Sequence, residues 1–143
     1  MAYLRNPSFE NDINNWTFGP AGSDASFQSI PLFGIAPISG SNVGFLQSYN
    51  PNAFVSQEAT VDAPSVVCIA YVATTTGNVP GTLTIAIKGS QTKSVIPFSI
   101  ASTYQWQQIT GTLDLNGPAQ VVVEFKMLVG QVNSLVFDFV NLF

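Results

Sequence analysis

The side chains that could perform chemistry in this chain are few. Its 143 residues include eight Asp or Glu, four Lys or Arg and no histidine. Without histidine the chain lacks the usual general base and the commonest transition-metal ligand, and it cannot build a conventional Ser-His-Asp triad. The carboxylates fall mostly at turns or on the polar side of alternating segments, and no two are marked as the acid and nucleophile of a glycosidase. The sequence therefore predicts a protein that is not an enzyme and has no catalytic residues.

The distribution of charge excludes further classes of protein. The four cations, Arg5, Lys88, Lys93 and Lys126, are scattered, and the net charge is −4. No basic patch is therefore predicted for nucleic acid or for an anionic membrane. No apolar run approaches the roughly 20 residues that cross a bilayer. Cys68 lies in an apolar run, which predicts a small buried hydrophobe, and a single cysteine cannot form an internal disulfide.

Two polar segments place aromatic rings beside amide side chains. One contains Tyr49, Asn50 and Asn52, and the other contains Tyr104 followed by several glutamines. A flat ring can stack on the apolar face of a sugar while neighbouring amides bond its hydroxyls. We therefore predict these four residues as ligand-binding residues, with a glycan as the partner.

The elements that must position these residues are strands. Polar and apolar residues alternate in three segments, 82–88, 108–115 and 120–128, and glycines and prolines separate the short apolar segments. Pro97 lacks a backbone donor, which predicts an edge strand or a bulge around it. The pattern predicts about eight to eleven strands in one all-β domain over residues 1–143, a two-sheet antiparallel β-sandwich or a barrel.

Two of the expected strands, 66–73 and 135–143, are apolar on both faces. The outer face of such a strand must be covered by a loop of the same chain or by another chain, and the sequence leaves both open. A long loop before residue 42 carries Leu32, Phe33 and Ile35. We expect the fold of the single chain to leave these three side chains exposed, and exposed apolar side chains predict contacts in a homo-oligomer.

Three short motifs lie at the two ends and in the middle of the chain. It opens with Asn6-Pro7-Ser8-Phe9-Glu10 and Trp16-Thr17, carries Ser39-Gly40-Ser41-Asn42 before an apolar strand, and ends with Phe137-Asp138-Phe139-Val140. Together these motifs resemble the jelly-roll carbohydrate-binding modules, which are galactose-binding-like domains and also occur in phage virion proteins. The resemblance implies a jelly-roll sandwich and covers most of the chain.

The same resemblance implies one structural calcium ion. Its ligands would be Glu10, Asp138 and the turn that contains Ser39 and Asn42. Calcium takes roughly six to eight oxygen ligands, and two carboxylates would supply the charge. The alternative is that Glu10 caps a turn and Asp138 accepts backbone N–H bonds without a metal.

Two functions follow as expectations. The first is a non-enzymatic structural or adhesive protein of a virion surface, of the decoration or attachment type, made without a signal peptide because none is visible after Met1. Low charge and high apolar content suit packing against neighbouring copies or other virion proteins. The alternative is a free-standing glycan-binding module.

Overall fold

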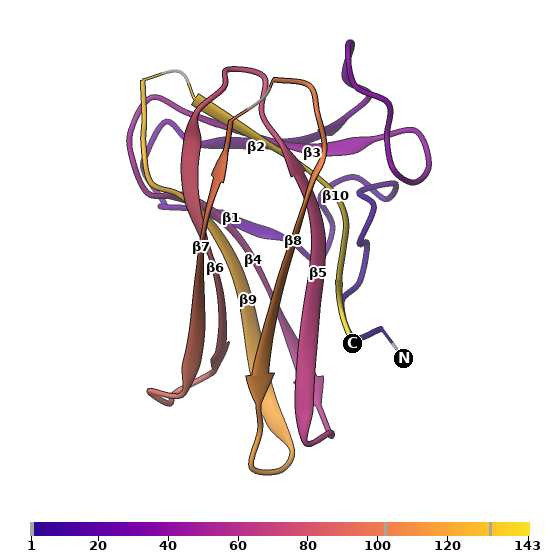
Figure 1. The fold of residues 1–143 in the computed structure, drawn as a ribbon, viewed down its shortest axis with the longest axis vertical. Helices are drawn as coiled ribbons and strands as arrows, with labels where there is room; N and C mark the ends of the chain where they lie inside the picture. Colours follow the sequence, from indigo (N-terminus) through magenta and orange to yellow (C-terminus); the bar gives the residue numbers. More distant parts are fainter. Residues whose placement is uncertain (1, 102, 132) are drawn as a thin grey trace.

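The computed structural model describes residues 2–101, 103–131 and 133–143, and in these ranges the chain forms ten strands and no helix (Figure 1). No helix long and apolar enough to cross a membrane occurs among these residues. The strands are β1 (Thr17–Gly19), β2 (Ser26–Ile30), β3 (Val43–Ser48), β4 (Ala53–Val61), β5 (Ser65–Ala73), β6 (Val79–Ile87), β7 (Lys93–Ile100), β8 (Gln107–Asp114), β9 (Ala119–Met127) and β10 (Asn133–Leu142).

The strands form two antiparallel five-stranded sheets. One sheet has the order β1-β4-β9-β6-β7, and we call it the β9 sheet; the other has the order β2-β3-β10-β5-β8, and we call it the β10 sheet. β7 ends the β9 sheet, so Pro97 lies in an edge strand as predicted. The arrangement is the predicted two-sheet jelly-roll sandwich.

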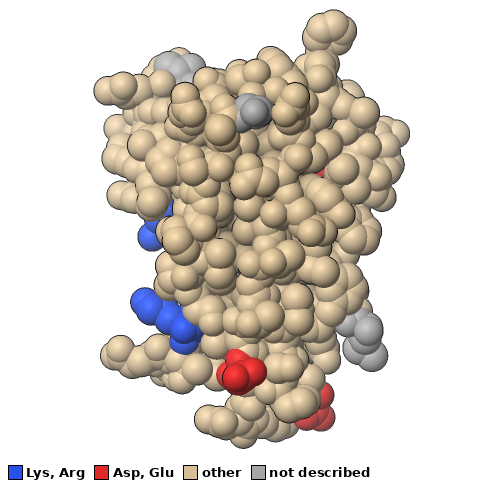
Figure 2. All heavy atoms as spheres, viewed as in Figure 1, with Lys and Arg blue, Asp and Glu red and all other residues tan. Residues whose placement is uncertain are grey.

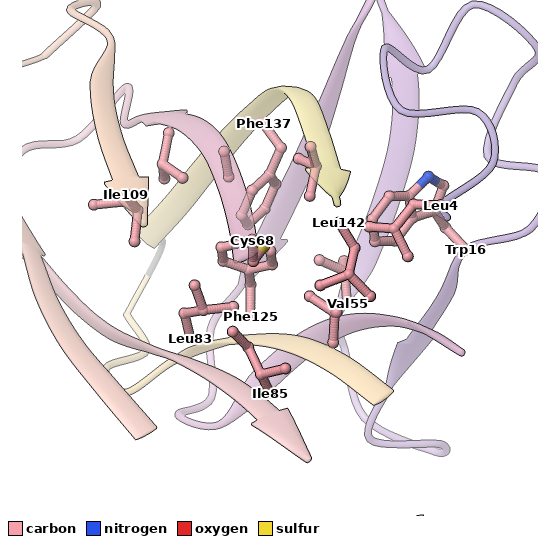
Figure 3. Close-up of a cluster of buried hydrophobic side chains, with 14 of the residues drawn as sticks. Leu4, Trp16, Val55, Cys68, Leu83, Ile85, Ile109, Phe125, Phe137 and Leu142 are labelled. Carbon is pink, nitrogen blue, oxygen red and sulfur yellow. The ribbon is translucent and has the colours of Figure 1, made fainter. Parts of the chain in front are cut away.

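Side-chain alternation places the core between the sheets. Leu83 of β6 and Phe125 of β9 face Phe137 of β10 and Cys68 of β5 (Figure 3). The rings of Phe125 and Phe137 lie 5.2 Å apart in an edge-to-face arrangement. Burial of each large apolar side chain contributes about 1.5–3 kcal/mol. Cys68 is fully buried in this core, as predicted, and its burial raises the pKa of the thiol to about 12.

The N-terminal segment links the two ends of the chain. The Tyr3 N–H donates to the Leu142 carbonyl at 2.8 Å, and the Val140 N–H donates to the Pro7 carbonyl at 2.9 Å. The first described residues and the last strand consequently lie side by side (Figure 1). Trp16 ends this segment and is buried in the core.

The loop of residues 31–42 covers part of the outer face of the β10 sheet. Ile35 packs against Val136 of β10, and the indole N–H of Trp106 donates to the Ala36 carbonyl at 2.8 Å. The sequence left open whether a loop of the same chain or another chain covers this face. For this part of the face, the cover is the chain's own loop. Ile35 is only 8% exposed, so the premise that it is left in water for an oligomer contact is wrong.

The tip of the same loop and another part of the same face stay open. Phe33 is 97% exposed and Leu32 is half-buried. On the outer side of β5 and β10, Val67 and Phe139 are exposed and Tyr71 is half-buried. An oligomer contact through Phe33 and Leu32 therefore stays a prediction.

Charged side chains occupy little of the surface. On the face shown in Figure 2 they lie mainly at the left edge and the lower end. Two of the four cations pair with carboxylates on the β9 sheet: Lys88 Nζ lies 3.1 Å from Glu58, and Lys126 Nζ lies 3.8 Å from Glu124.

Candidate functional site

Glu10 and Asp138, from opposite ends of the chain, meet at the predicted Ser-Gly-Ser-Asn turn. Glu10 accepts the backbone N–H of Ser41 on Oε1 at 2.8 Å and that of Asn42 on Oε2 at 2.7 Å. Asp138 accepts the Ser39 N–H on Oδ2 at 2.9 Å. The structure thus brings together all four residues predicted for the calcium site. We call this arrangement the carboxylate turn.

Backbone conformation supports the carboxylate turn on both sides. Gly40 has a φ of +69°, and a Cβ atom there would collide with the Glu10 carboxylate. On the other side, the Phe139 N–H donates to Asp138 Oδ1 at 2.8 Å, at a shift in the register of β10 against β5 where Phe139 itself has a φ of +47°. A bulge commonly re-aims a side chain out of its ladder. Glycine at position 40 is therefore required both by the turn and by the contact.

The electrostatics of the carboxylate turn favour a proton or a cation. Asp138 is fully buried, and burial raises its pKa above the ordinary 3.8. Backbone N–H bonds oppose this shift, while the negative charge of Glu10 adds to it. Neither ion pair found among the described residues involves Asp138 or Glu10. A cation placed here would neutralise two carboxylates that no basic side chain pairs.

Calcium fits this donor set in part. The two carboxylates keep unused lone pairs, and the Ser39 hydroxyl and the Asn42 amide oxygen lie on the same turn. No group of three or more His, Cys, Asp or Glu that could hold a metal occurs among the described residues. Waters or backbone carbonyls would therefore have to supply the remaining oxygens that calcium requires.

A second candidate site lies at one end of the sandwich. Because the strands are antiparallel, the loops that follow β1, β3, β5, β7 and β9 all reach this end. Here Tyr49, 64% exposed, borders an open groove of about 600 Å³. We call it the Tyr49 groove, and its lining consists of Tyr49, Pro51, Asn78, Leu128, Val129, Gly130, Gln131 and Asn133.

Asp24 holds the Tyr49 loop in place. It accepts the Tyr49 N–H on Oδ2 at 2.9 Å, the Asn50 amide on Oδ1 at 2.9 Å and the Ser48 hydroxyl at 3.2 Å. Burial by itself raises the pKa of Asp24, but these bonds together outweigh it and leave the pKa below 3.8. The carboxylate therefore stays ionised and keeps the loop ordered under the exposed ring.

The opposite wall of the groove is bonded to the same loop. The Gln131 N–H donates to the Tyr49 carbonyl at 2.7 Å, and a Cβ atom on Gly130 would collide with that carbonyl. Asn78 and Gln131 have φ values of +51° and +68°. Non-glycine residues in this conformation cluster at ligand-binding sites.

Two of the predicted ligand residues have structural roles beside the groove. The Asn50 side chain is bonded to Asp24, and Asn52 has a φ of +72° with its N–H donating to the Met127 carbonyl at 2.8 Å. Neither residue lines the groove.

The groove is lined by three further amide residues, Asn78, Gln131 and Asn133. None of the three was identified from the sequence. They lie between 29 and 84 positions after Tyr49 in the chain. Only the strand order brings them together, so no local signal could have found them.

Tyr104 lies on a different loop. Its N–H donates to the Thr74 carbonyl at 2.8 Å, and its ring packs on Gly34, next to the exposed Phe33. It does not line the Tyr49 groove. Tyr49 and Tyr104 therefore belong to separate surfaces.

Comparison with known proteins was informative only at the level of structure. No family model matches the sequence, and no curated protein matches it either. Among solved structures, TmCBM61 in complex with β-1,4-galactotriose is 15% identical with a TM-score of 0.76, over 100% of this chain and 98% of that one. A family 16 carbohydrate-binding module is 15% identical with a TM-score of 0.68, over 99% of both chains.

A phage structure shares the fold as well. The enzymatically active domain of tailspike protein 4 from bacteriophage CBA120 is 14% identical with a TM-score of 0.77 over 99% of this chain, which corresponds to 21% of the tailspike chain. Identities this low show the fold alone. The chain has the jelly-roll fold of carbohydrate-binding modules.

Proposed function

We propose that this chain is a non-enzymatic adhesive domain that binds glycans in the Tyr49 groove. The observation that carries the proposal is the exposed Tyr49 ring beside three amide side chains in one concave site. A pyranose stacked on the ring would meet donors and acceptors from Asn78 and Gln131 at its edge.

The rigidity of the groove supports this proposal. Asp24 holds one wall, and the Gln131 N–H bond to the Tyr49 carbonyl holds the other. A site whose loops are already ordered loses less conformational freedom when a ligand binds, so weak sugar contacts yield more net affinity. The described lining also contains no carboxylate or thiol, which suits binding without chemistry.

The more specific form of the proposal is a virion-surface protein of the decoration or attachment type. Two observations support it: a phage tailspike domain shares the fold, and Phe33 is almost fully exposed at a loop tip. Leaving a large apolar side chain in water forgoes roughly 1.5–3 kcal/mol, which favours a neighbouring copy or another virion protein as its cover. The alternative is a free-standing glycan-binding module, in which the Phe33 loop stays uncovered.

One structural calcium ion is also part of the proposal. The observation that supports it is the buried Asp138 beside Glu10, neither of which takes part in an ion pair within the described ranges. The ion would join the first turn of the chain to its last strand and so stabilise the sandwich without contacting the Tyr49 groove.

Glycan binding is tested by a glycan array followed by titration of the best binder against two tyrosine variants. We expect Tyr49→Ala to weaken binding by about tenfold or more, because stacking on an aromatic ring is lost. Tyr104→Ala removes a similar side chain from another loop and should leave affinity nearly unchanged. If Tyr104→Ala abolishes binding while Tyr49→Ala does not, the glycan site lies elsewhere and the proposal fails.

Assembly is tested by native mass spectrometry and analytical ultracentrifugation. We expect an oligomer that Phe33→Asp dissociates into folded monomers, because a charge cannot be buried at the contact without a partner. Val95→Asp, at an exposed apolar position on the edge strand β7, is the matched control and should leave the oligomer intact. A monomer at high concentration in the unmodified protein would favour the free-standing module.

A further inference from the structure

A second hollow, of about 670 Å³, lies beside the N-terminal segment and shares no residue with the Tyr49 groove. It is lined by residues 56–60 of β4, by the N-terminal segment, by the start of β1 and by the start of β9, and we call the β4 residues its floor. We call it the Arg5 hollow, and its lining consists of Tyr3, Arg5, Asn15, Thr17, Ser56, Gln57, Glu58, Ala59, Thr60 and Gln120.

A buried amide fixes the backbone of Arg5 at the rim. Gln57 is only 6% exposed, its Oε1 accepts the Arg5 N–H at 2.7 Å, and its Nε2 donates to the Arg5 carbonyl at 2.9 Å. The bond from the Tyr3 N–H to the Leu142 carbonyl holds the chain two residues earlier. These bonds use main-chain atoms of Arg5 alone, so the exposed guanidinium is presented without taking part in the fold.

The charges around the hollow leave one positive charge uncompensated. Glu58, on the floor, is paired with Lys88 at 3.1 Å. Among the described residues, neither of the two ion pairs involves Arg5. Arg5 therefore stands in the lining as a cation outside both ion pairs, while Glu58, the carboxylate of the lining, has its own partner in Lys88.

Gln120 is a second residue of the lining whose side chain can donate. The Thr60 hydroxyl donates to Gln120 Oε1 at 2.9 Å, which leaves the Gln120 NH₂ group as a donor toward the hollow. The Lys88 N–H donates to the Gln120 carbonyl at 2.8 Å and fixes that backbone. Asn15, Thr17 and Ser56 add further amide and hydroxyl groups.

We propose that the Arg5 hollow binds a sugar residue that carries one carboxylate. A guanidinium pairs with a carboxylate through two parallel N–H···O bonds, and such charge-assisted bonds are stronger than neutral ones. One cation matches a monoanion, whereas phosphate recognition generally gathers several basic groups. The hydroxyl and amide lining matches sugar hydroxyls, and the half-buried Tyr3 adds one aromatic side chain to the lining.

The test uses NMR titration of ¹⁵N-labelled protein with three acidic sugars, D-glucuronate, D-galacturonate and N-acetylneuraminate, and with neutral glucose and galactose. We expect at least one acidic sugar to shift the resonances of Arg5, Asn15 and Gln120, and the neutral sugars to leave them unchanged. We expect Arg5→Ala to weaken this binding by about tenfold, because the bidentate pair is lost.

Lys93→Ala is the matched control, since it removes the same charge from an exposed position outside the hollow. It should leave the affinity for the acidic sugar nearly unchanged, and so should Tyr49→Ala. The proposal is overturned if no acidic sugar shifts these resonances, if neutral sugars shift them equally, or if Lys93→Ala weakens binding as much as Arg5→Ala does. Because the Tyr49→Ala variant tests the other groove alone, failure at one site is distinguishable from failure at the other.

Discussion

The carboxylate turn and the Tyr49 loop use the same device for opposite purposes. In each, a carboxylate accepts backbone N–H groups of a loop: Asp138 holds the turn at Ser39, and Asp24 holds the loop at Tyr49. Asp138 is fully buried and its pKa is raised, whereas Asp24 is exposed and its pKa is lowered. The first arrangement closes a loop onto the sheet, and the second presents an aromatic ring to solvent.

The difference shows what solvent does to a carboxylate that organises backbone. Out of water, the cost of desolvating the charge exceeds what the N–H bonds return, so a proton or cation is favoured. In contact with water, the same bonds favour the ionised form. A buried carboxylate such as Asp138 therefore holds a loop against the sheet at the cost of desolvating its charge. An exposed carboxylate such as Asp24 orders a binding loop without that cost.

The largest expected effect is a difference in the free energy of unfolding between variants of the two carboxylates. Asp138→Ala removes the buried acceptor of two part-buried N–H groups, those of Ser39 and Phe139, and we expect a loss of roughly 2–5 kcal/mol in the free energy of unfolding. Asp24→Ala should cost clearly less, because water replaces the lost acceptor, and should instead speed amide exchange at Tyr49. Chemical denaturation and hydrogen exchange measure the two effects. Equal losses for both variants would contradict the comparison.

Calcium removal is expected to have the next largest effect. An ion that binds only the native state stabilises it by mass action, by about 2.7 kcal/mol at a hundredfold excess over its Kd. We expect chelation to lower the Tm of the unmodified protein and to leave that of Glu10→Gln unchanged. Glu124→Gln, which alters a surface ion pair, should keep the response. An unmodified protein whose Tm is indifferent to both calcium and chelator binds no stabilising calcium at this turn.

The smallest expected effect is the dependence of stability on pH in the presence of chelator. The folded state binds a proton at Asp138 more readily than the unfolded state, so stability should fall as the pH rises above 3.8 through the raised pKa. Asp24 acts in the other direction, since its stabilising bonds are lost as the pH falls below 3.8 through its lowered pKa.

Thermal unfolding across this range should therefore show a maximum on the acidic side of neutrality. Asp138→Asn should remove the decline toward neutral pH and leave the acid limb in place. A decline that survives this substitution would assign the titration to another group.

Much of the fold follows from local patterns in the sequence. The alternation in residues 82–88 corresponds to β6, where Leu83 and Ile85 are buried and Thr84 is not. Pro97 predicted an edge strand or a bulge, because a residue without an N–H cannot serve a central ladder, and β7 is an edge strand. The meeting of Glu10 with Asp138 followed from the resemblance to carbohydrate-binding modules and not from any local pattern.

The sites were less predictable, because their parts are far apart in the chain. Tyr49 was identified as an exposed aromatic from its polar neighbours, but Asn50 turned out to be bonded to Asp24, 26 positions earlier. Exposure of Ile35 was expected from its place in a long loop, and only its packing on Val136 shows that it is buried.

By itself, the sequence determined the all-β class, the buried thiol of Cys68 and the scarcity of groups that could perform catalysis, and it limited the strand around Pro97 to an edge or a bulge. These properties depend on residue type and on the alternation of polar and apolar residues along a strand, and both can be read from residues that are close together in the sequence. The tertiary structure decided which loops share an end and which side chains share a hollow. Asn78 and Gln131 lie in one groove with Tyr49, and Gln57 bonds to Arg5, because the order of the strands brings these residues together. The order of the strands depends in turn on how the two sheets bury their apolar faces against each other.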